Sequence, residues 1–584
     1  MRKNMLLCLL AGLLLTCGAN PVVAEEIDMT AFSVYVGGHY TDFNDYAKKI
    51  GEYNLITDDP YPELGLTLKR FKSGQAYFFD GHYYDKYNHN ADLKVNLSDR
   101  FKFKADYQGM VHNEGQNLLE FMETREYLPT TGANGGKILT HELLDPGADY
   151  YENRYEVNTE AELLISRKGN IKLIAAHRSL IEHGKEQKLS TDHCYSCHVT
   201  SESAMIEQAM HEFETGFEAE AAGIDFGYLF AYRTFSSDAE ETLADYDVAM
   251  HPGAGVGPDS VYYYEFGSRQ LFSDTSLTIG TYPDTKKMSH KVRAGGDLGS
   301  GKIVGSITYA TTENQDIAFI GDNLKTNSFG ASVNYAVLLN PKTRLIAKAK
   351  MTRVESSDPY IDLPIFRDGR SGPNIDFDYI RYSSLDRRTF DFSAEIINRL
   401  TKRLTLSFLG GMDYNLHNDY PDLASETKTH KMIGQLKVKY RQGLDFTLQG
   451  KYRYEKTDEP FTNYRGLFEA EGREALQVTL PGPVAFYYQR EDLKHQNITT
   501  EPTDYHEIEV KARFTPEPKW GMNASFKVIS DKNTDLDSLD VKHLSVQPGL
   551  GLTYMPDMRW ALAAGYNYNY YKSRGPVTVA LFDG

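Results

Sequence analysis

The chain has 584 residues, of which 25% are charged, with a formal net charge of −18 and a mean hydropathy of −0.49. The low hydropathy argues against a helical membrane protein, and the acidic balance argues against a nucleic-acid partner, because neutralising phosphates needs an excess of Lys and Arg. The aromatic residues are unevenly distributed among types, with 41 Tyr and 29 Phe but only 2 Trp. The length fits either several globular domains or one large barrel.

Residues 1–24 are predicted to be a secretory signal peptide. The basic residues Arg2 and Lys3 precede an apolar run that is too short to span a bilayer as a helix. Cleavage would remove two positive charges and no negative one, so the mature chain, residues 25–584, would carry a charge of −20 and two of the four cysteines. Lipid attachment at Cys17 is the alternative interpretation.

The mature chain alternates between apolar and polar residues over repeated stretches of about ten residues. For example, Leu436, Val438 and Tyr440 alternate with Lys437 and Lys439. An apolar face and a charged face on each strand are typical of a wall between lipid and a wet lumen. Because lipid does not tolerate open sheet edges, we expect the strands to close into a barrel.

The predicted connections alternate in length as well. Short ones include 340–343 and 441–443, whereas long polar ones lie near 109–152, 235–259, 354–386, 415–430, 455–504 and 529–543. We therefore predict an all-β fold, a large transmembrane antiparallel β-barrel of roughly 22–26 strands with long external loops, integral to the bacterial outer membrane. Residues 575–582 are either a short closing strand, or the last strand is missing or atypical.

A C-x-x-C-H motif, Cys194-Tyr195-Ser196-Cys197-His198, contains the two cysteines of the mature chain. At this spacing the two thiols can add to the two vinyl groups of one haem, and His198 then falls where it can ligate the iron. We expect the motif to lie in a loop over residues 183–204, on the outer face. The candidate distal ligands are His193 and His211, followed by His183, His177, Met205 and Met210.

Two other interpretations of the cysteine pair stay open. A C-x-x-C pair in an oxidising compartment can close as a disulfide or act as a redox pair. A zinc site made of Cys194, Cys197 and His198 would be one ligand short, although His193 or His211 could complete it.

Residues 37–97 carry a further pattern: Gly51-Glu52-Tyr53, then Gly65-Leu66-Thr67-Leu68, then Ala76 to Gly81 and a hairpin. This resembles the N-terminal part of the decahaem-associated outer-membrane barrels of the MtrB/PioB type, and Tyr-rich hairpins of similar style continue over nearly all of the mature chain. The resemblance implies a sheath around a periplasmic multihaem c-type cytochrome, with an extracellular multihaem cytochrome docked outside. In that family the C-x-x-C usually lies nearer the N-terminus, which puts the role of the present pair in doubt.

The resemblance thus implies a non-enzymatic conduit porin for electron transfer to extracellular acceptors such as metal oxides. One alternative is a diffusion porin for solutes whose cysteines form a structural disulfide. Another is a barrel that carries one c-type haem of its own as a relay. We expect a lipid bilayer and cytochromes as partners, no nucleic acid, and no metal or catalytic residue in the chain itself.

Overall fold

The computed structural model describes residues 28–40, 60–98, 100–118, 140–167, 169–193, 198–246, 250–254, 261–265, 270–271, 275–315, 317–318, 320–362, 366–368, 374–375, 379–381, 385–417, 427–458, 468–470, 501–534, 541–557 and 560–575. All the named elements in these residues are β-strands. Among the residues described, no helix is long and apolar enough to cross a membrane.

One sheet of 23 strands forms the body of the molecule. Its first part consists of β1 (Asp28–His39), β2 (Tyr61–Lys72), β3 (Gln75–Tyr83), β4 (His89–Leu97), β5 (Phe101–Glu114), β6 (Thr140–Leu143), β7 (Tyr150–Ser166), β8 (Ile171–His193), β9 (His198–Ala221) and β10 (Ile224–Ser237). Its second part consists of β16 (Asp284–Leu298), β17 (Gly301–Gln315), β18 (Leu324–Asn340), β19 (Thr343–Ser356), β24 (Arg387–Arg399), β25 (Leu404–His417), β26 (Thr427–Gln442), β27 (Phe446–Asp458), β29 (Asp504–Phe514), β30 (Trp520–Lys532), β31 (Lys542–Asp557), β32 (Trp560–Asn567) and β33 (Tyr570–Arg574).

We call the strands of this sheet other than β6 the wall strands, counting β32 and β33 as one. Each wall strand pairs antiparallel with the next wall strand along the chain. Where short strands intervene in a connection, the wall passes over them, so that β5 pairs with β7, β10 with β16, β19 with β24 and β27 with β29. The short β6 is the exception, because it pairs in parallel with the start of β9. β32 and β33 pair with successive parts of β31 and together make one interrupted wall strand.

The remaining strands lie in the long connections and form small separate sheets. They are β11 (Thr242–Tyr246) with β15 (Thr275–Ile279), β12 (Met250–Ala254) with β13 (Val261–Glu265), β14 (Gln270–Leu271) with β21 (Phe366–Asp368) and β22 (Asn374–Ile375), and β20 (Tyr360–Ile361) with β23 (Tyr379–Arg381) and β28 (Phe468–Ala470).

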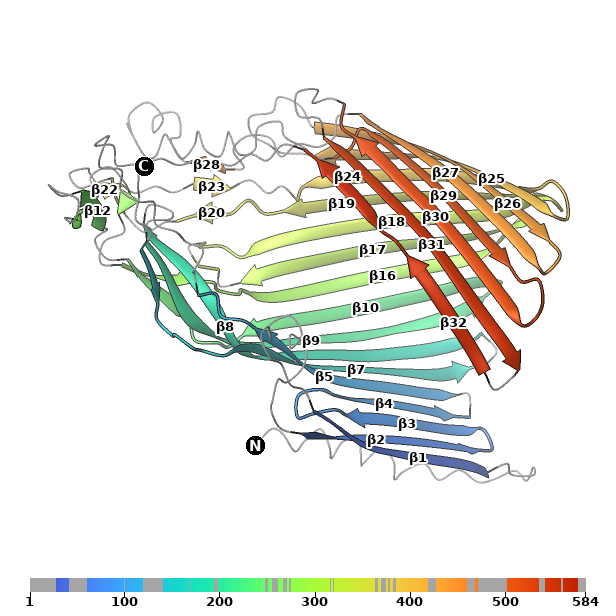
Figure 1. Ribbon diagram of the computed structural model, residues 1–584, viewed down its shortest axis with the longest axis horizontal. Coiled ribbons are helices and arrows are strands. Elements are labelled where there is room, and N and C mark those ends of the chain that lie inside the picture. Colours follow the sequence, from blue (N-terminus) through green and yellow to red (C-terminus); the bar gives the residue numbers. More distant parts are fainter. Residues whose placement is uncertain are drawn as a thin grey trace.

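The sheet curls around a hollow, with β1 and β32 at its two ends (Figure 1). The short turns gather at one end, which we call the short-turn end, and the long connections gather at the other, the long-loop end. The turn between β9 and β10 contains Ala222 and Gly223, both at positive φ (54° and 77°). Two such residues give a two-residue turn whose twist matches that of the flanking strands, which keeps the hairpin tight.

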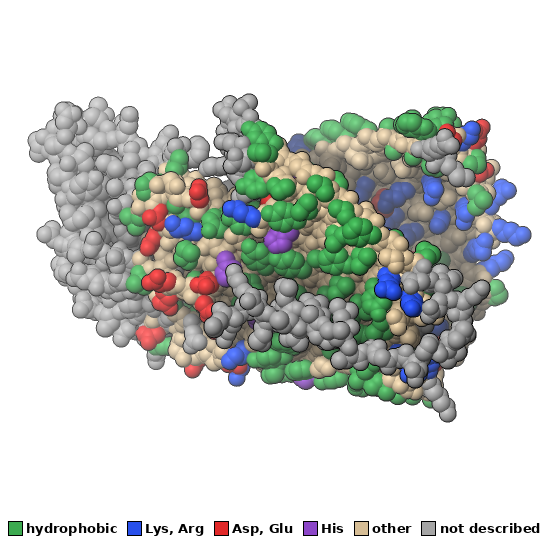
Figure 2. Space-filling model, turned by 90° about the horizontal axis from the view of Figure 1, so that it is seen from below, with side chains coloured by type: hydrophobic (Ala, Val, Ile, Leu, Met, Phe, Trp, Pro, Cys, Tyr) green, Lys and Arg blue, Asp and Glu red, His purple; other side chains and the backbone are tan. Residues whose placement is uncertain are grey.

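The alternating pattern decides which face of each strand points outward. On β26, Met432, Leu436 and Val438 are exposed on the outside, whereas Lys437 lies on the opposite face and pairs with Glu395 of β24 across the inner wall (3.7 Å). Figure 2 shows the same division, with hydrophobic side chains over the outer surface and Lys and Arg inside the hollow. The protein is a large antiparallel β-barrel of the membrane-spanning type, as the sequence predicts. Among the described residues no pairing joins β1 to β32 or β33, so the expected closure of the sheet is not seen there.

One sequence prediction is wrong, and others fall on residues that the structure does not describe. The loop predicted over 183–204 is wrong, because β8 continues to His193 and β9 starts at His198, so that only 194–197 connect them. The prediction failed because this stretch is mostly polar and lacks a regular apolar face, which a strand projecting beyond the membrane does not need. Residues 1–24 and the proposed closing strand from 576 onward lie outside the described residues.

Candidate functional site

The C-x-x-C-H motif joins the two longest strands of the molecule. β8 has 23 residues and β9 has 24, and His193 and His198 at their ends are register partners. Cys194 and Cys197 fall in the four-residue connection and lie outside the described residues. The short turn between β7 and β8 is at the opposite end of β8, so the motif lies at the long-loop end.

The hairpin below the motif, which we call the stem, is residues 185–193 and 198–206. Gln187 joins the stem to the preceding long connection: its side-chain oxygen accepts the backbone N–H of Asn117 (2.7 Å), and its Nε2 donates to the Asn117 carbonyl (2.9 Å). The same Nε2 reaches the hydroxyl of Ser201 across the hairpin (2.5 Å), and Ser201 is fully buried. Pairing of β6 with residues 198–201 adds a third strand.

Asp145 ties the connection between β6 and β7 to the stem. Its Oδ2 accepts the backbone N–H of Ser203 (3.2 Å), and the Ser203 hydroxyl also lies 3.1 Å from the hydroxyl of Tyr150. The hydrogen bond from Ser203 holds the pKa of Asp145 below the ordinary value of an aspartate. Gln116 closes the group by donating to the Asp145 carbonyl (2.7 Å).

A third contact reaches the stem from the connection before β16. Lys188 Nζ lies 2.9 Å from Glu186 Oε1 and 3.2 Å from the Tyr282 hydroxyl, and it stands 4.7 Å from the centre of the Tyr282 ring. Burial opposes the charge of Lys188, but the hydrogen bonds to Glu186 and Tyr282 outweigh it and raise the pKa of Lys188. Three separate segments thus hold the hairpin that presents the motif.

The candidate distal ligands separate clearly in the structure. His193 adjoins the motif at the end of β8. His211 lies thirteen residues beyond His198 on β9, which corresponds to about 43 Å along an extended strand. It stacks on His177 of β8 with ring centres 5.7 Å apart, and its side of β9 also carries the exposed, outward-facing Phe213. His193 is thus next to the motif along the chain, whereas the structure places His211 far from it.

The second notable feature is the charged inner wall. Glu507 of β29 is only 5% exposed and lies 2.8 Å from Lys451 Nζ of β27 and 3.1 Å from Lys527 Nζ of β30. Lys451 also approaches Glu509 (3.5 Å). Sequence analysis did not single out these residues, although the alternation that places Lys437 inward also places them inward. Their partners lie on neighbouring wall strands, and the sequence alone does not give the register that brings them together.

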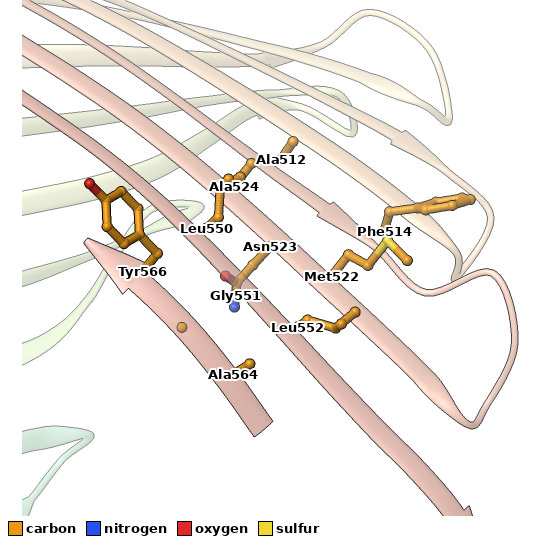
Figure 3. Close-up of a pocket in the computed structure, with 11 residues that line it drawn as sticks. Ala512, Phe514, Met522, Asn523, Ala524, Leu550, Gly551, Leu552, Ala564 and Tyr566 are labelled. Atoms are coloured by element: carbon orange, nitrogen blue, oxygen red, sulfur yellow. The ribbon is translucent and has the colours of Figure 1, made fainter. Parts of the chain in front are cut away.

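The outer wall also carries a hollow, shown in Figure 3, which lies across β29, β30, β31 and β32. The side chains that line it include Phe514, Met522, Leu550, Leu552 and Tyr566. These residues occupy the outward positions of their strands, so the hollow opens on the apolar surface that would face lipid. Small residues between the larger ones account for its shape.

Among the residues that the structure describes, no three His, Cys, Asp or Glu side chains are grouped closely enough to hold a metal ion. The possible zinc ligands Cys194 and Cys197 belong to the connection outside that coverage.

No protein-family model and no curated protein sequence matches the chain. Among solved structures, it is similar to the FrpB iron transporter from Neisseria meningitidis, F5-1 variant (9% identity, TM-score 0.47, 89% of this chain and 78% of that chain). It is also similar to the copper transporter OprC (8%, 0.46, 93% and 73%) and the siderophore receptor PiuA from Acinetobacter baumannii (8%, 0.45, 95% and 81%).

Proposed function

We propose that the chain is the outer-membrane barrel of a porin–cytochrome complex, in which it forms the sheath around a multihaem c-type cytochrome and has no catalytic activity of its own. The observation that carries this proposal is the wide barrel with a charged inner wall. A barrel of more than twenty strands is too wide for its own side chains to fill. Its inner wall offers hydrogen-bonding and charged groups such as Lys437, Lys451 and Glu507 to a water-soluble protein.

The cysteine motif supports the redox part of the proposal. An exported chain reaches the compartment where haem is attached, and each thiol would add its S–H across one vinyl group, a step that needs no oxidant. Cys194 and Cys197 would hold the group and His198 would supply the axial nitrogen. A sixth ligand would come from His193 or from a partner, since His211 lies far along β9.

Such a complex would carry electrons across the membrane. Hydrocarbon is an insulator, so electrons cannot cross it in one long step, whereas closely spaced haems in a protein can pass them on. The barrel would keep lipid away from such a chain of haems. An extracellular cytochrome would receive the electrons at the long-loop end, where the stem and its motif project.

A solute pore is the second candidate, because a charged inner wall also suits a hydrated channel. The two candidates differ in what fills the lumen. A conduit is occupied by a protein and conducts ions poorly, whereas an empty pore conducts freely.

Purification from the native membrane in mild detergent distinguishes them. Every co-purifying band would be stained for haem and identified by mass spectrometry. We expect a multihaem cytochrome in fixed ratio to the barrel. A colourless barrel with no cytochrome would contradict the proposal and leave a porin with a disulfide.

The same preparation tests the relay role of the motif. Cys194→Ala should abolish haem stain on the barrel band itself, while the matched variant Ser196→Ala, in the same connection, keeps both thiols and should keep the stain. If the barrel band is unstained in the wild type and in both variants, the pair is assigned to a disulfide and the sheath proposal still stands.

A further inference from the structure

The inner wall carries a group of basic residues at the short-turn end, which we call the basic strip. It is made up of Arg344 and Lys348 on β19, Arg399 on β24, Lys439 and Arg441 on β26, and Lys511 and Arg513 on β29. All seven are exposed and lie on the lumen side of their strands, as the inward position of Lys437 on β26 establishes through the register. Figure 2 shows Lys and Arg inside the hollow at this end.

The register arranges the strip in rows across the wall. Arg399 lies opposite Thr405, which lies opposite Lys439; Lys439 lies opposite Gln449, which lies opposite Lys511. A neutral residue thus separates the charges within a row, and because adjacent strands are about 4.8 Å apart, these charges stand about 10 Å apart and repel one another weakly. Along a strand the spacing is closer, since Lys439 and Arg441 are two residues apart on β26, about 7 Å.

Most of the strip is not neutralised by the chain. Among the described residues, Lys511 pairs with Glu509 (2.7 Å), whereas none of the other six members of the strip forms an ion pair. Thr405, Lys439, Gln449 and Lys511 also line a hollow in the inner wall, so the strip borders a concave surface. By contrast, Lys451 and Lys527, which lie nearer the long-loop end of the same wall, form ion pairs with Glu507.

The opposite side of the barrel has the opposite charge. On β7 and β9 the lumen-facing positions carry Glu160, Glu162, Glu212, Glu214 and Glu218. Three of these glutamates are paired, Glu162 with Lys102 (3.6 Å), Glu212 with Arg233 (2.7 Å) and Glu218 with Lys172 (3.7 Å), so the charge on this side is balanced only in part. Figure 1 places β7 and β9 across the hollow from β26 and β29. The lumen therefore has a basic side and an acidic side, in a chain whose net charge is −18.

We propose that the basic strip is the docking surface for an acidic face of the protein that enters the lumen from the short-turn end. This inference rests on the proposed function. It adds the sign of the charge on the partner's docking face and the orientation of the partner about the barrel axis. Lipid headgroups are excluded from inward-facing positions. From β19 to β29 the strip crosses six wall strands, about 24 Å, which exceeds the reach of one small anion and suits a protein face.

The test uses the complex purified from the native membrane, carrying Lys439→Gln, Arg441→Gln and Arg513→Gln together. The matched control removes three exposed charges at the long-loop end, in Lys286→Gln, Lys428→Gln and Lys572→Gln. Haem retained per barrel is measured as the salt concentration is raised, and re-association is followed at low salt. Heat-modifiable migration in gels checks that each barrel has folded.

We expect the strip variant to release the haem protein at lower salt and to re-associate about tenfold more slowly at low ionic strength, with the control unchanged. Retention equal to wild type would overturn the inference while leaving the sheath in place. An empty barrel that loses anion selectivity in planar bilayers, with unchanged haem retention, would also overturn it and assign the strip to solute passage. A wild-type barrel with no haem protein would overturn both proposals.

Discussion

Glu507 shows how single residues hold the inner wall together. It is nearly buried between two lysines from neighbouring strands, so its carboxylate receives charge-assisted hydrogen bonds on both sides. Such bonds are stronger than neutral ones, and removing the acid leaves both ammonium groups without their main partner. Each residue of this kind links three strands at once.

Glu507→Gln should therefore destabilise the barrel by about 1–3 kcal/mol. The measurement is the thermal midpoint at which the folded band is lost in detergent. Asp297→Asn is the control, because its pair with Lys302 is 4.0 Å long and both side chains are largely exposed, so its loss should cost less than about 1 kcal/mol. Equal shifts in the two variants would show that Glu507 contributes no more than a surface pair.

Asp145 adds a pH dependence to the stem. Its pKa is lower in the folded protein than in an unfolded chain, because the ionised form accepts the Ser203 hydrogen bond. The stability it contributes is present above the unfolded pKa and is lost as the pH falls through the folded pKa, that is, below about pH 4. Protonation weakens this tie between the β6–β7 connection and β9, while the hydrogen bond from the Leu144 N–H to the Ser201 carbonyl (3.0 Å) remains.

Hydrogen-exchange protection of peptides from residues 198–206, corrected for intrinsic rates, should fall below about pH 4. Asp145→Asn should show reduced protection already at neutral pH and no further acid step. An acid step of undiminished size in Asp145→Asn would assign the loosening to other groups.

At the residue scale the sequence predicts what lies within one stretch of chain. The spacing of Cys194, Cys197 and His198 identifies the motif, and alternation identifies the inward position of Lys437. It cannot rank His193 above His211, because both are near the motif in sequence and only the extended course of β9 separates them. Nor does it show the ties of Gln187 and Asp145 to the stem, which join segments distant in sequence.

The hairpin of β8 and β9 is the element that differs most from the sequence-based expectation. Its outer part is held by β6, by Gln187 and by the contact of Lys188 with Tyr282. Strands that continue into water carry no lipid-facing residues, so their pattern is the one expected of a loop. Alternation therefore predicts the strands where they cross the membrane and misses them where they leave it.

Gly184 lies on β8 opposite Glu152 of β7, and a Cβ at this position would collide with the backbone carbonyl of Tyr151. Gly184→Ala should separate the two strands locally and lower the amount of folded barrel in the membrane. Gly450→Ala on β27 is the control, because nothing lies within 4 Å of the added carbon. Comparable folded yields for both variants would show that the wall adjusts to the extra methyl group at little cost.

At the scale of the whole molecule, alternation with period two and alternating connection lengths were enough to predict a large antiparallel barrel. The structure confirms that class and joins 23 strands in one sheet. The distribution of charge around the lumen could not be predicted, because it depends on which strands face one another across the hollow. The basic and acidic sides emerge only when β7 and β9 are placed opposite β26 and β29 (Figure 1).

The proposed function requires that this barrel lets a cytochrome carry electrons across a membrane. The most direct measurement uses liposomes that enclose a reduced dye, with an impermeant electron acceptor outside. Liposomes containing the purified barrel with its haem protein should oxidise the enclosed dye without losing it, whereas liposomes with the emptied barrel, which is an open pore, should lose the dye, and liposomes without protein should keep it reduced. Dye that leaks out through the barrel, or that stays reduced in the presence of the intact complex, would contradict the account.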